Sequence, residues 1–359
     1  GNIIDVAARD TAELMAGMPS LACASGNMVT AADEKRASIK NKVGSYYWEK
    51  SRVETQNLDY ADSVNCYGHG AWVVEPDYVR QCPMIRFESA FGSYYFKDRF
   101  GNTEWYAKIQ CVSAGELANL FPEHRNRILG VQDGKPQRTL SAMLKLVRYM
   151  DTKQTLVYLP ECEYVTLVAK PNLLSRTPVA IAERPNIDDD PRGQYDDVVW
   201  PAIAQSLMKQ YMLKAAEFVV NAPWVMPLDV TDVNTGADAI MRSDTPSQIG
   251  KVPLNIPQDL FALGADLDRD IKQGSRYPEA RTGGIKGNIV TGRGVEELMG
   301  TMDTQVRTMQ TVIGRALEEA TSLCFEMDSK LWPDVPKRIT GVLTGKPFEV
   351  TYTPSKDIG

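Results

Sequence analysis

The sequence predicts a mixed α+β fold, and three features of its apolar pattern support that prediction. Apolar residues recur at helical spacing over residues 3–15, 32–53 and 58–67. Residues 83–111, with turn signals between aromatic and β-favouring stretches, and residues 140–149 and 155–169, with strand-like alternation, predict a series of short strands. Residues 295–331 then keep a helical period throughout, which predicts one helix of roughly 55 Å at ~1.5 Å per residue.

The first elements have recognisable ends. The helix over residues 3–15 stops at the breaker "GMP", and the helical pattern of residues 58–67 gives way to a short β run in "YGHGAWVVEPD". Turn signals at residues 91–92 and 100–102 predict a hairpin or meander over residues 83–111.

A short helix and further strands complete the first block. Ser113 and Glu116 have the spacing of a capping box, in which each side chain binds the other's backbone N–H and so starts a helix. Residues 140–149 and 155–169 return to strand-like alternation. The first ~170 residues are therefore predicted to form an α+β unit.

The segment "ERPNIDDDPRGQYDDVVW" marks a boundary before a new helix. Pro201 suits the first turn of that helix, where its missing N–H costs nothing, and the preceding aspartates suit the positive end of the helix dipole. The helix carries an apolar stripe of Val199, Ile203, Leu207, Tyr211, Ala215 and Phe218.

Two further segments lead back to the long helix. Residues 222–257 hold five prolines and little periodicity, which predicts an excursion away from any core. Residues 259–273 are helical again, with Leu260, Leu263, Leu267 and Ile271 at steps of three and four. Beyond the long helix, residues 348–353 are strand-like.

Composition limits the classes of protein to which the chain can belong. Its 359 residues are 43% hydrophobic and 24% charged, which suits two or three structural units with buried cores. A net charge of −6 argues against a general nucleic-acid coat but leaves room for a local basic patch. The six cysteines are scattered without a C-x-x-C pair, as expected of reduced thiols.

No apolar run reaches the ~20 residues of a membrane span, and no signal peptide is visible. The chain begins at Gly1 within a helical pattern and without an initiator Met. We therefore expect it to be a piece of a longer protein that is trimmed or disordered at both ends.

The glycine-rich stretch "ARTGGIKGNIVTGRGVEELMG" is the main candidate site. It lacks the Lys-Ser or Lys-Thr pair of a phosphate-binding P-loop, and Gly292-Arg293-Gly294 lacks the third glycine of a dinucleotide fingerprint. A flexible connector before a helix is one alternative. The other is loose, sequence-blind contact with phosphates, because residues 274–293 hold four cations against the single carboxylate of Glu279.

Other candidate chemistry is thin. His69 and His124 lie in predicted turns or loops without a nucleophile or ligand partner near them in sequence. The acidic pair around Cys162 and the three aspartates at 188–190 match no calcium loop, and solvated or helix-dipole roles are the simpler interpretation. We expect no catalytic site, no metal and no cofactor.

The order of elements, together with local motifs, resembles the portal proteins of tailed bacteriophages, in particular those of mycobacteriophage-type siphoviruses. The motifs are "AERPNIDDDPRGQYDDVVWPAI", "GSRYPEARTGG", "NIVTGRGVEELMG", "DTQV" and "CFEMDSKLWP". They cover the chain from about Pro178 to its end. The first half matches more loosely, chiefly through "VNCYGHGAWVVEPD".

The resemblance implies a portal fold and a division of the chain into named parts. An α+β wing takes residues 1–185, a first stem helix 186–218, a clip 219–256, a second stem helix 257–273, a tunnel loop 274–293, and the wing again 294–359 with its long helix and closing strand. The helical crown of the family is absent from this chain.

The resemblance also implies a function without catalysis. A ring, typically of twelve subunits, would occupy one vertex of the capsid in the virion, after assembly in the host cytoplasm. It would conduct double-stranded DNA independently of sequence during packaging and ejection. Its partners would be the terminase packaging motor, then the head-to-tail connector, and the major capsid protein, with no membrane.

The residues that would carry these roles fall into three groups. The DNA-facing cations of the tunnel loop would be Arg276, Arg281, Lys286 and Arg293. The loop hinges, where glycine permits unusual dihedral angles, would be Gly274, Gly283, Gly284, Gly287, Gly292 and Gly294. The stem would pack through Ile203, Leu207, Tyr211, Leu263 and Leu267.

Two other functions remain open on the sequence. One is a nucleotide-binding enzyme that uses the glycine-rich loop. The other is a purely structural capsid or tail component that never touches DNA, in which case the loop is only a connector.

Overall fold

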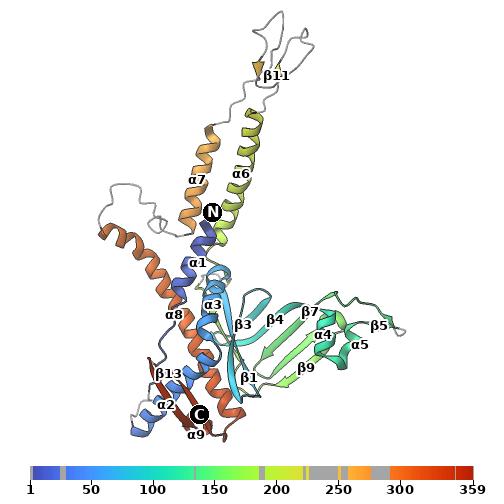
Figure 1. Ribbon diagram of the computed structural model, residues 1–359, viewed down its shortest axis with the longest axis vertical. Helices are drawn as coiled ribbons and strands as arrows, with labels where there is room; N and C mark the ends of the chain where they lie inside the picture. Colours follow the sequence, from blue (N-terminus) through green and yellow to red (C-terminus); the bar gives the residue numbers. More distant parts are fainter. Residues whose placement is uncertain are drawn as a thin grey trace, which may run out of the picture. The chain divides into compact units, whose positions relative to one another are not determined.

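The computed structural model describes residues 3–24, 30–132, 135–185, 191–220, 224–225, 250–251, 258–275, 292–343 and 345–358 (Figure 1). It is a mixture of helices and antiparallel sheets, as the sequence predicts. The chain divides into two units, the first made of residues 1–194 and 299–359 and the second of residues 195–298.

The long helices of the first unit begin and end at local sequence signals. They are α1 (Ile3–Met15), α2 (Ala31–Lys50), α3 (Val53–Tyr67) and the greater part of α8 (Gly292–Leu331). At the start of α2, Thr30 and Asp33 form a capping box, each side chain accepting from the other's backbone N–H at 3.2–3.3 Å. Arg52, with φ 53°, separates α2 from α3, so this break falls before the predicted one.

A three-stranded sheet packs against α3. It consists of β1 (His69–Asp77), β2 (Cys82–Glu88) and β10 (Val179–Glu183), in the order β10-β1-β2. Trp72 lies at its centre, between Ala180 and Phe87, and its indole stacks on Tyr60 at 4.4 Å between ring centroids. The Tyr60 hydroxyl also accepts a hydrogen bond from the Ala182 N–H at 2.9 Å, which fixes the helix to the sheet.

A five-stranded sheet runs in the order β3-β4-β7-β8-β9. Its strands are β3 (Ser93–Lys97), β4 (Thr103–Ser113), β7 (Met143–Asp151), β8 (Gln154–Leu159) and β9 (Val165–Pro171). Near one end, Tyr106 and Met150 share a core with Val73 and Ile181 of the smaller sheet. Near the other end, Leu144 and its neighbours form a second core with the short helices α4 (Ala114–Leu120) and α5 (Arg125–Ile128).

Several short helices and strands lie at the end of this sheet whose core contains Leu144. They are α4 (Ala114–Leu120), η1 (Pro122–His124), α5 (Arg125–Ile128), β5 (Val131–Gln132), β6 (Lys135–Pro136) and η2 (Pro160–Cys162). Ser113 does cap α4, because its hydroxyl accepts from the Glu116 N–H at 3.2 Å. The reciprocal half of the predicted capping box, from the Ser113 N–H to the Glu116 side chain, is not formed.

The predicted hairpin or meander over residues 83–111 is correct only in part. β3 and β4 do form a hairpin, with Tyr95 opposite Tyr106. The preceding strand, β2, instead pairs with β1 in the other sheet. Turn signals locate strand ends, but they do not decide which sheet a strand joins.

Asp328 of α8 joins several elements of the first unit. Its carboxylate is fully buried and accepts hydrogen bonds from the hydroxyls of Tyr47, at 2.6 Å, and Tyr352, at 2.9 Å, and it is paired with Lys337. The last two residues belong to the hairpin of β13 (Lys337–Leu343) and β14 (Lys346–Tyr352), which α9 (Pro354–Asp357) follows. The closing strand is therefore as predicted, while its partner β13 was missed.

The second unit contains an antiparallel pair of helices, α6 (Asp196–Val220) and α7 (Gln258–Gly274). Two short strands, β11 (Trp224–Val225) and β12 (Gly250–Lys251), also pair; the rest of the predicted excursion lies outside the described residues. Because α6 begins at Asp196, Pro201 lies in its second turn and not, as predicted, in its first. The first turn holds Asp196 and Asp197 instead, where the helix dipole favours them.

Candidate functional site

The cations predicted to face DNA lie beyond what the structure describes. Arg276, Arg281 and Lys286, together with Gly283, Gly284 and Gly287, are outside the described residues. Gly292, Arg293 and Gly294 lie in the first turn of α8, where only the backbone is described, so the loop ends before the predicted boundary. Gly274 ends α7, and a Cβ there would contact Val198 of α6 at 3.5 Å.

The helical pair of the second unit is joined by one face of each helix. Met208 contacts Gly264, where an added Cβ would approach its Cε to 3.3 Å, and Gln205 donates a hydrogen bond to Asp268 at 3.4 Å. Val198, Met208 and Ile271 are buried apolar residues of this face. Small residues such as Gly264 allow the two helices to approach closely.

The apolar stripe predicted on α6 is on the opposite side of that helix. At about 100° per residue, Leu207 lies about 160° around the axis from Gln205. Ile203, Leu207 and Tyr211 keep 45%, 48% and 64% of their surface exposed, and Val199 and Leu263 are exposed as well. Of the predicted stem-packing residues only Leu267 is partly covered within the chain.

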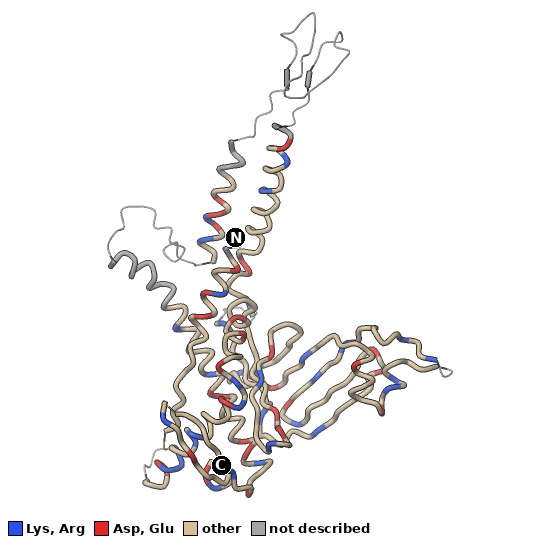
Figure 2. Tube along the Cα trace, in the orientation of Figure 1, with Lys and Arg blue, Asp and Glu red and all other residues tan. Residues whose placement is uncertain are grey.

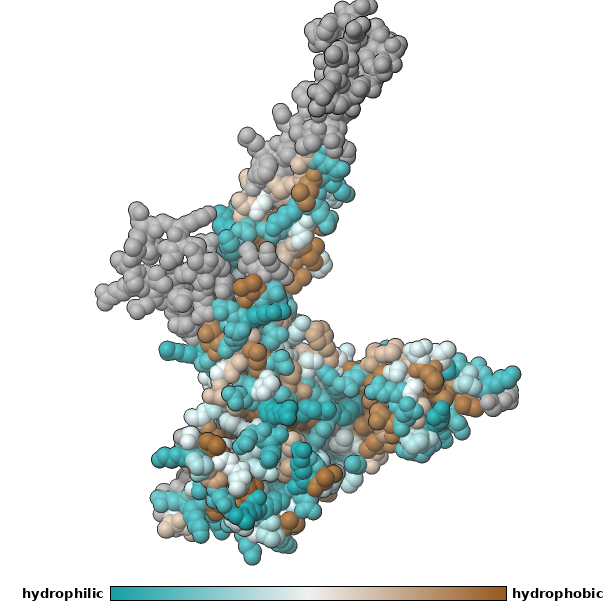
Figure 3. All heavy atoms as spheres, in the orientation of Figure 1, coloured by the Kyte–Doolittle hydropathy of each residue, from teal (hydrophilic) through white to brown (hydrophobic). Residues whose placement is uncertain are grey.

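α6 is therefore apolar on two opposite faces, of which α7 covers one. Figure 3 shows hydrophobic side chains at the surface of this helical pair. The exposed side of α7 is more polar: Asp266, Arg269 and Asp270 are exposed there together with Leu263, and Figure 2 shows acidic residues along that helix. A helix with a second apolar face is typical of one that packs against a further partner.

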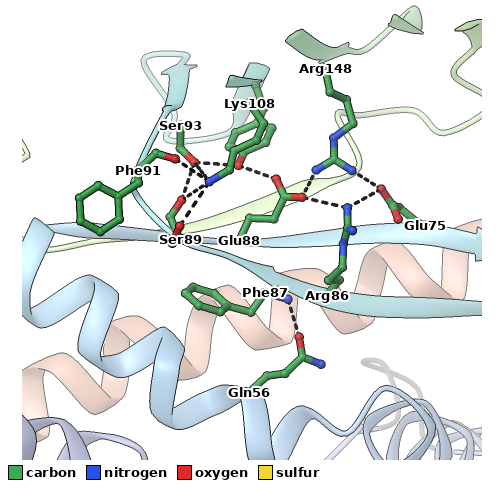
Figure 4. Close-up of polar contacts among 11 residues, drawn as sticks. Gln56, Glu75, Arg86, Phe87, Glu88, Ser89, Phe91, Ser93, Lys108 and Arg148 are labelled. Carbon is green, nitrogen blue, oxygen red and sulfur yellow. Dashed lines mark hydrogen bonds and ion pairs between the residues drawn. The ribbon is translucent and has the colours of Figure 1, made fainter. Parts of the chain in front are cut away.

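A network of charged side chains lies between the two sheets of the first unit (Figure 4). Arg86 pairs with Glu75 at 3.2 Å and with Glu88 at 2.9 Å, and Arg148 pairs with the same two carboxylates. Tyr106 donates a further hydrogen bond to Glu88 at 2.8 Å. Burial lowers the pKa of Arg148 to about 10, which leaves it charged at neutral pH.

Lys108 extends this network on the same side of the sheet (Figure 4). Its side chain is nearly buried, and its ammonium donates to the carbonyls of Ser89 and Phe91 at 2.7 Å and to the Ser93 hydroxyl at 3.1 Å. Burial lowers its pKa. The three donors of the ammonium are thus used to fix the loop before β3, which is a structural role.

Sequence analysis missed this network. Arg86, Glu88 and Arg148 occur in "MIRFE" and "KLVRYM", where alternation places each of them on the side of its strand that faces the other sheet. A charged residue at an inward position is the signal that could have revealed the network. Since inward charges need partners, a carboxylate and cations at such positions would be expected to pair.

Beside the network is a cavity of about 320 Å³, which we call the lateral cavity. Three ionic side chains border it, those of Glu75, Arg148 and Lys170, and Tyr78 and Leu173 are exposed at its edge. The apolar lining comes from four strands (β1, β7, β8 and β9), from the segment after β9 and from α8: Val74, Met150, Val157, Val168, Leu174, Met327 and Leu331.

The other residues considered from sequence do not form a reactive site. His69 is largely buried at the start of β1, with its ring 5.1 Å from that of Tyr95, and burial lowers its pKa. His124 ends η1. Burial raises the pKa of the Cys162 thiol, and none of the six cysteines forms a disulfide. Within the described part of the chain, no group of His, Cys, Asp or Glu has the arrangement of a metal site.

Comparisons with known proteins do not show the family of the chain. No family model matches the chain, and no curated protein matches it. Among solved structures, a chain from the virion of a native gene transfer agent particle aligns with a TM-score of 0.47 and 9% sequence identity, covering 90% of this chain and 78% of that one. None of the described helices is long and apolar enough to cross a membrane.

Proposed function

We propose that this chain is a portal protein of a tailed bacteriophage: a subunit of a ring at one capsid vertex through which double-stranded DNA passes. The proposal rests on the sequence motifs that resemble this family and on one structural observation, the second apolar face of α6. The protein has no catalytic activity of its own in this proposal, and it binds no cofactor.

The exposed face of α6 supports assembly into a ring. Val199, Ile203, Leu207 and Tyr211 recur every four residues, and α7 lies on the opposite side. Covering the exposed half of these side chains would contribute roughly 1 kcal/mol each. In a closed ring every copy uses one face to cover a different face of its neighbour, so the stripe of each subunit is buried.

The DNA-conducting role rests on the glycine-rich segment. Its cations, Arg276, Arg281, Lys286 and Arg293, carry positive charge in a chain of net charge −6. Arranged around a ring, they would contact phosphates without reading sequence, while an acidic remainder limits adhesion. The acidic exposed side of α7, with Asp266 and Asp270, is compatible with a channel through which DNA slides.

The other partners follow from the resemblance. The segment over residues 219–256 would bind the terminase packaging motor during filling and the head-to-tail connector afterwards. The first unit would contact the major capsid protein in the virion. We place the protein at the portal vertex of the capsid.

End-on electron micrographs of the purified protein test the ring. The expected result is a rotationally symmetric particle, of twelve subunits if it follows the resemblance, with a central hole wide enough for a duplex. Pore-free monomers at high protein concentration would contradict the proposal.

The DNA contact is tested separately, by replacing Arg276, Arg281 and Lys286 with glutamine. We expect intact rings and impaired packaging or retention of DNA. Unchanged packaging would leave the loop as a connector and support a purely structural role. Saturable ATP binding or hydrolysis by the isolated protein would instead support a nucleotide-dependent enzyme.

A further inference from the structure

The lateral cavity has a lining suited to an aromatic side chain with a carboxylate next to it. Its volume of about 320 Å³ is at the small end of protein binding pockets, and its lining is largely apolar. Of its ionic side chains, Glu75 is already paired with Arg86 and Arg148. The two cations and one carboxylate of the lining leave an excess of positive charge.

That excess lies at the edge of the cavity. The ammonium of Lys170 is 5.4 Å from the centre of the Tyr78 ring, and within the described residues it belongs to no ion pair. Tyr78 and Leu173 are more than half exposed beside it. A ligand with a carboxylate next to an apolar group would therefore meet a cation at the mouth and apolar walls within.

One exposed segment of this same chain has the complementary chemistry. Tyr164, at the turn between η2 and β9, is 71% exposed and is flanked by the exposed carboxylates of Glu161 and Glu163. Glu163 and Tyr164 both have φ 55°, a conformation that residues with a side chain avoid. Arg138 holds the base of the turn, donating to the Glu161 carbonyl at 2.7 Å.

The turn and the cavity cannot meet within one chain. Tyr164 directly precedes β9, whereas Lys170 lies near the far end of that strand, about 20 Å away at ~3.3 Å per residue. Two complementary surfaces at opposite ends of one sheet are what a head-to-tail contact between identical subunits requires.

We propose that Tyr164 of one copy inserts into the lateral cavity of the next copy, with Glu161 or Glu163 pairing with Lys170 at its mouth. This inference rests on the proposed ring and names a contact that helps to close it. An aromatic side chain buried in a pocket is the usual form of an interface residue that contributes strongly to affinity.

Phe100 provides a matched comparison. It is 75% exposed, on the turn between β3 and β4, but its neighbour is the guanidinium of Arg99, 4.7 Å from the ring centre. If Phe100 entered the cavity, the guanidinium of Arg99 would approach the ammonium of Lys170, and the two positive charges would repel each other. Phe100 is the exposed aromatic residue that the proposal expects not to matter.

The first test measures ring assembly against protein concentration for full-length variants. Tyr164→Ser and Lys170→Glu should each raise the concentration needed for assembly about thirtyfold, while Phe100→Ser should leave it unchanged. Lys170→Glu combined with Glu161→Lys and Glu163→Lys should recover most of the loss. If Tyr164→Ser assembles like the wild type while the wild type forms rings, this contact is wrong and the ring stands.

Cross-linking keeps the proposal testable where a variant folds poorly. With Cys23, Cys66 and Cys111 replaced by serine, a chain carrying both Tyr164→Cys and Leu173→Cys should give a ladder of covalent oligomers with a short bis-maleimide. An equimolar mixture of the two single variants should give covalent dimers and nothing longer. Rings that yield no such products would overturn the contact, and a wild-type chain that never assembles would overturn it together with the proposed function.

Discussion

In the first unit the buried carboxylates of Asp328 and Glu88 are paired with cations, whereas the helical pair of the second unit leaves an apolar face uncovered. Asp328 is fully buried with three donors around it, and Arg148 shares two carboxylates with Arg86. On α6, by contrast, Leu207 and Tyr211 are about half exposed or more. The buried charges of the first unit are therefore neutralised within one chain, while the helical pair of the second unit keeps an apolar face that no part of the described chain covers.

The largest stability effect should come from Asp328. Replacing it with alanine leaves Lys337 and the hydroxyls of Tyr47 and Tyr352 without their buried acceptor. We expect a loss of about 4 kcal/mol in the free energy of unfolding, measured by urea denaturation. Asp334→Ala, at an exposed position close by, should change it by no more than about 0.5 kcal/mol. Equal effects of the two variants would refute the role of Asp328.

A slightly smaller effect is expected from Arg148→Met, which removes one cation from the network between the sheets. Glu88, only 5% exposed at its side chain, then keeps Arg86 but loses its second partner. We expect unfolding to become easier by about 3 kcal/mol, with Lys145→Met on the exposed side of the same strand as the control. Adding Glu88→Gln to the first variant should recover part of the loss; a further, fully additive loss would argue against coupling.

The two faces of α6 should respond in opposite ways. Met208→Ala removes a contact with α7 and should weaken the helical pair by about 2 kcal/mol, seen as an earlier loss of helical circular dichroism on heating. Leu207→Asp, or Leu263→Asp on α7, should leave the free chain nearly as helical as before but prevent assembly, because a buried unpaired carboxylate is costly. Normal rings from both aspartate variants would disprove the assignment of these faces.

The smallest expected effect is a loss of folding stability at low pH. Burial lowers the pKa of His69 below its ordinary value, despite the opposing attraction of Glu183. The unfolded chain therefore binds a proton more readily, and stability that is present above about pH 6.5 is lost as the pH falls. When the pH is lowered from 8 to 5, the urea concentration at which half of the protein is unfolded should fall less for His69→Gln than for the wild type. Parallel curves for the two proteins would exclude this contribution.

Element type was the most predictable part of this chain. Periodicity located α1, α6, α7 and α8 closely, because each keeps a helical period over many residues. The pairing of strands was harder to predict, because nothing in the local sequence "PMIRFE" indicates that β2 pairs with β1 rather than with β3. The break at Arg52 was also missed, since a left-handed residue other than glycine leaves no compositional signal.

The candidate sites divide in the same way. The apolar stripe of α6 could be read from spacing, but whether it faces α7 or solvent depends on where Met208 and Gly264 meet. The charge network and the lateral cavity arise from strands that are far apart in sequence, such as β1 and β7. The tunnel-loop cations stay a prediction.

Oxidative footprinting of the assembled protein tests the central claim most directly, by comparing the reactivity of side chains on α6 in the free chain and in the assembly. If neighbouring copies cover the second apolar face, Tyr211 and Leu207 should become protected on assembly, while Met208, already buried against α7, should hardly change. An assembled ring in which Tyr211 and Leu207 react as fast as in the free chain would contradict the account.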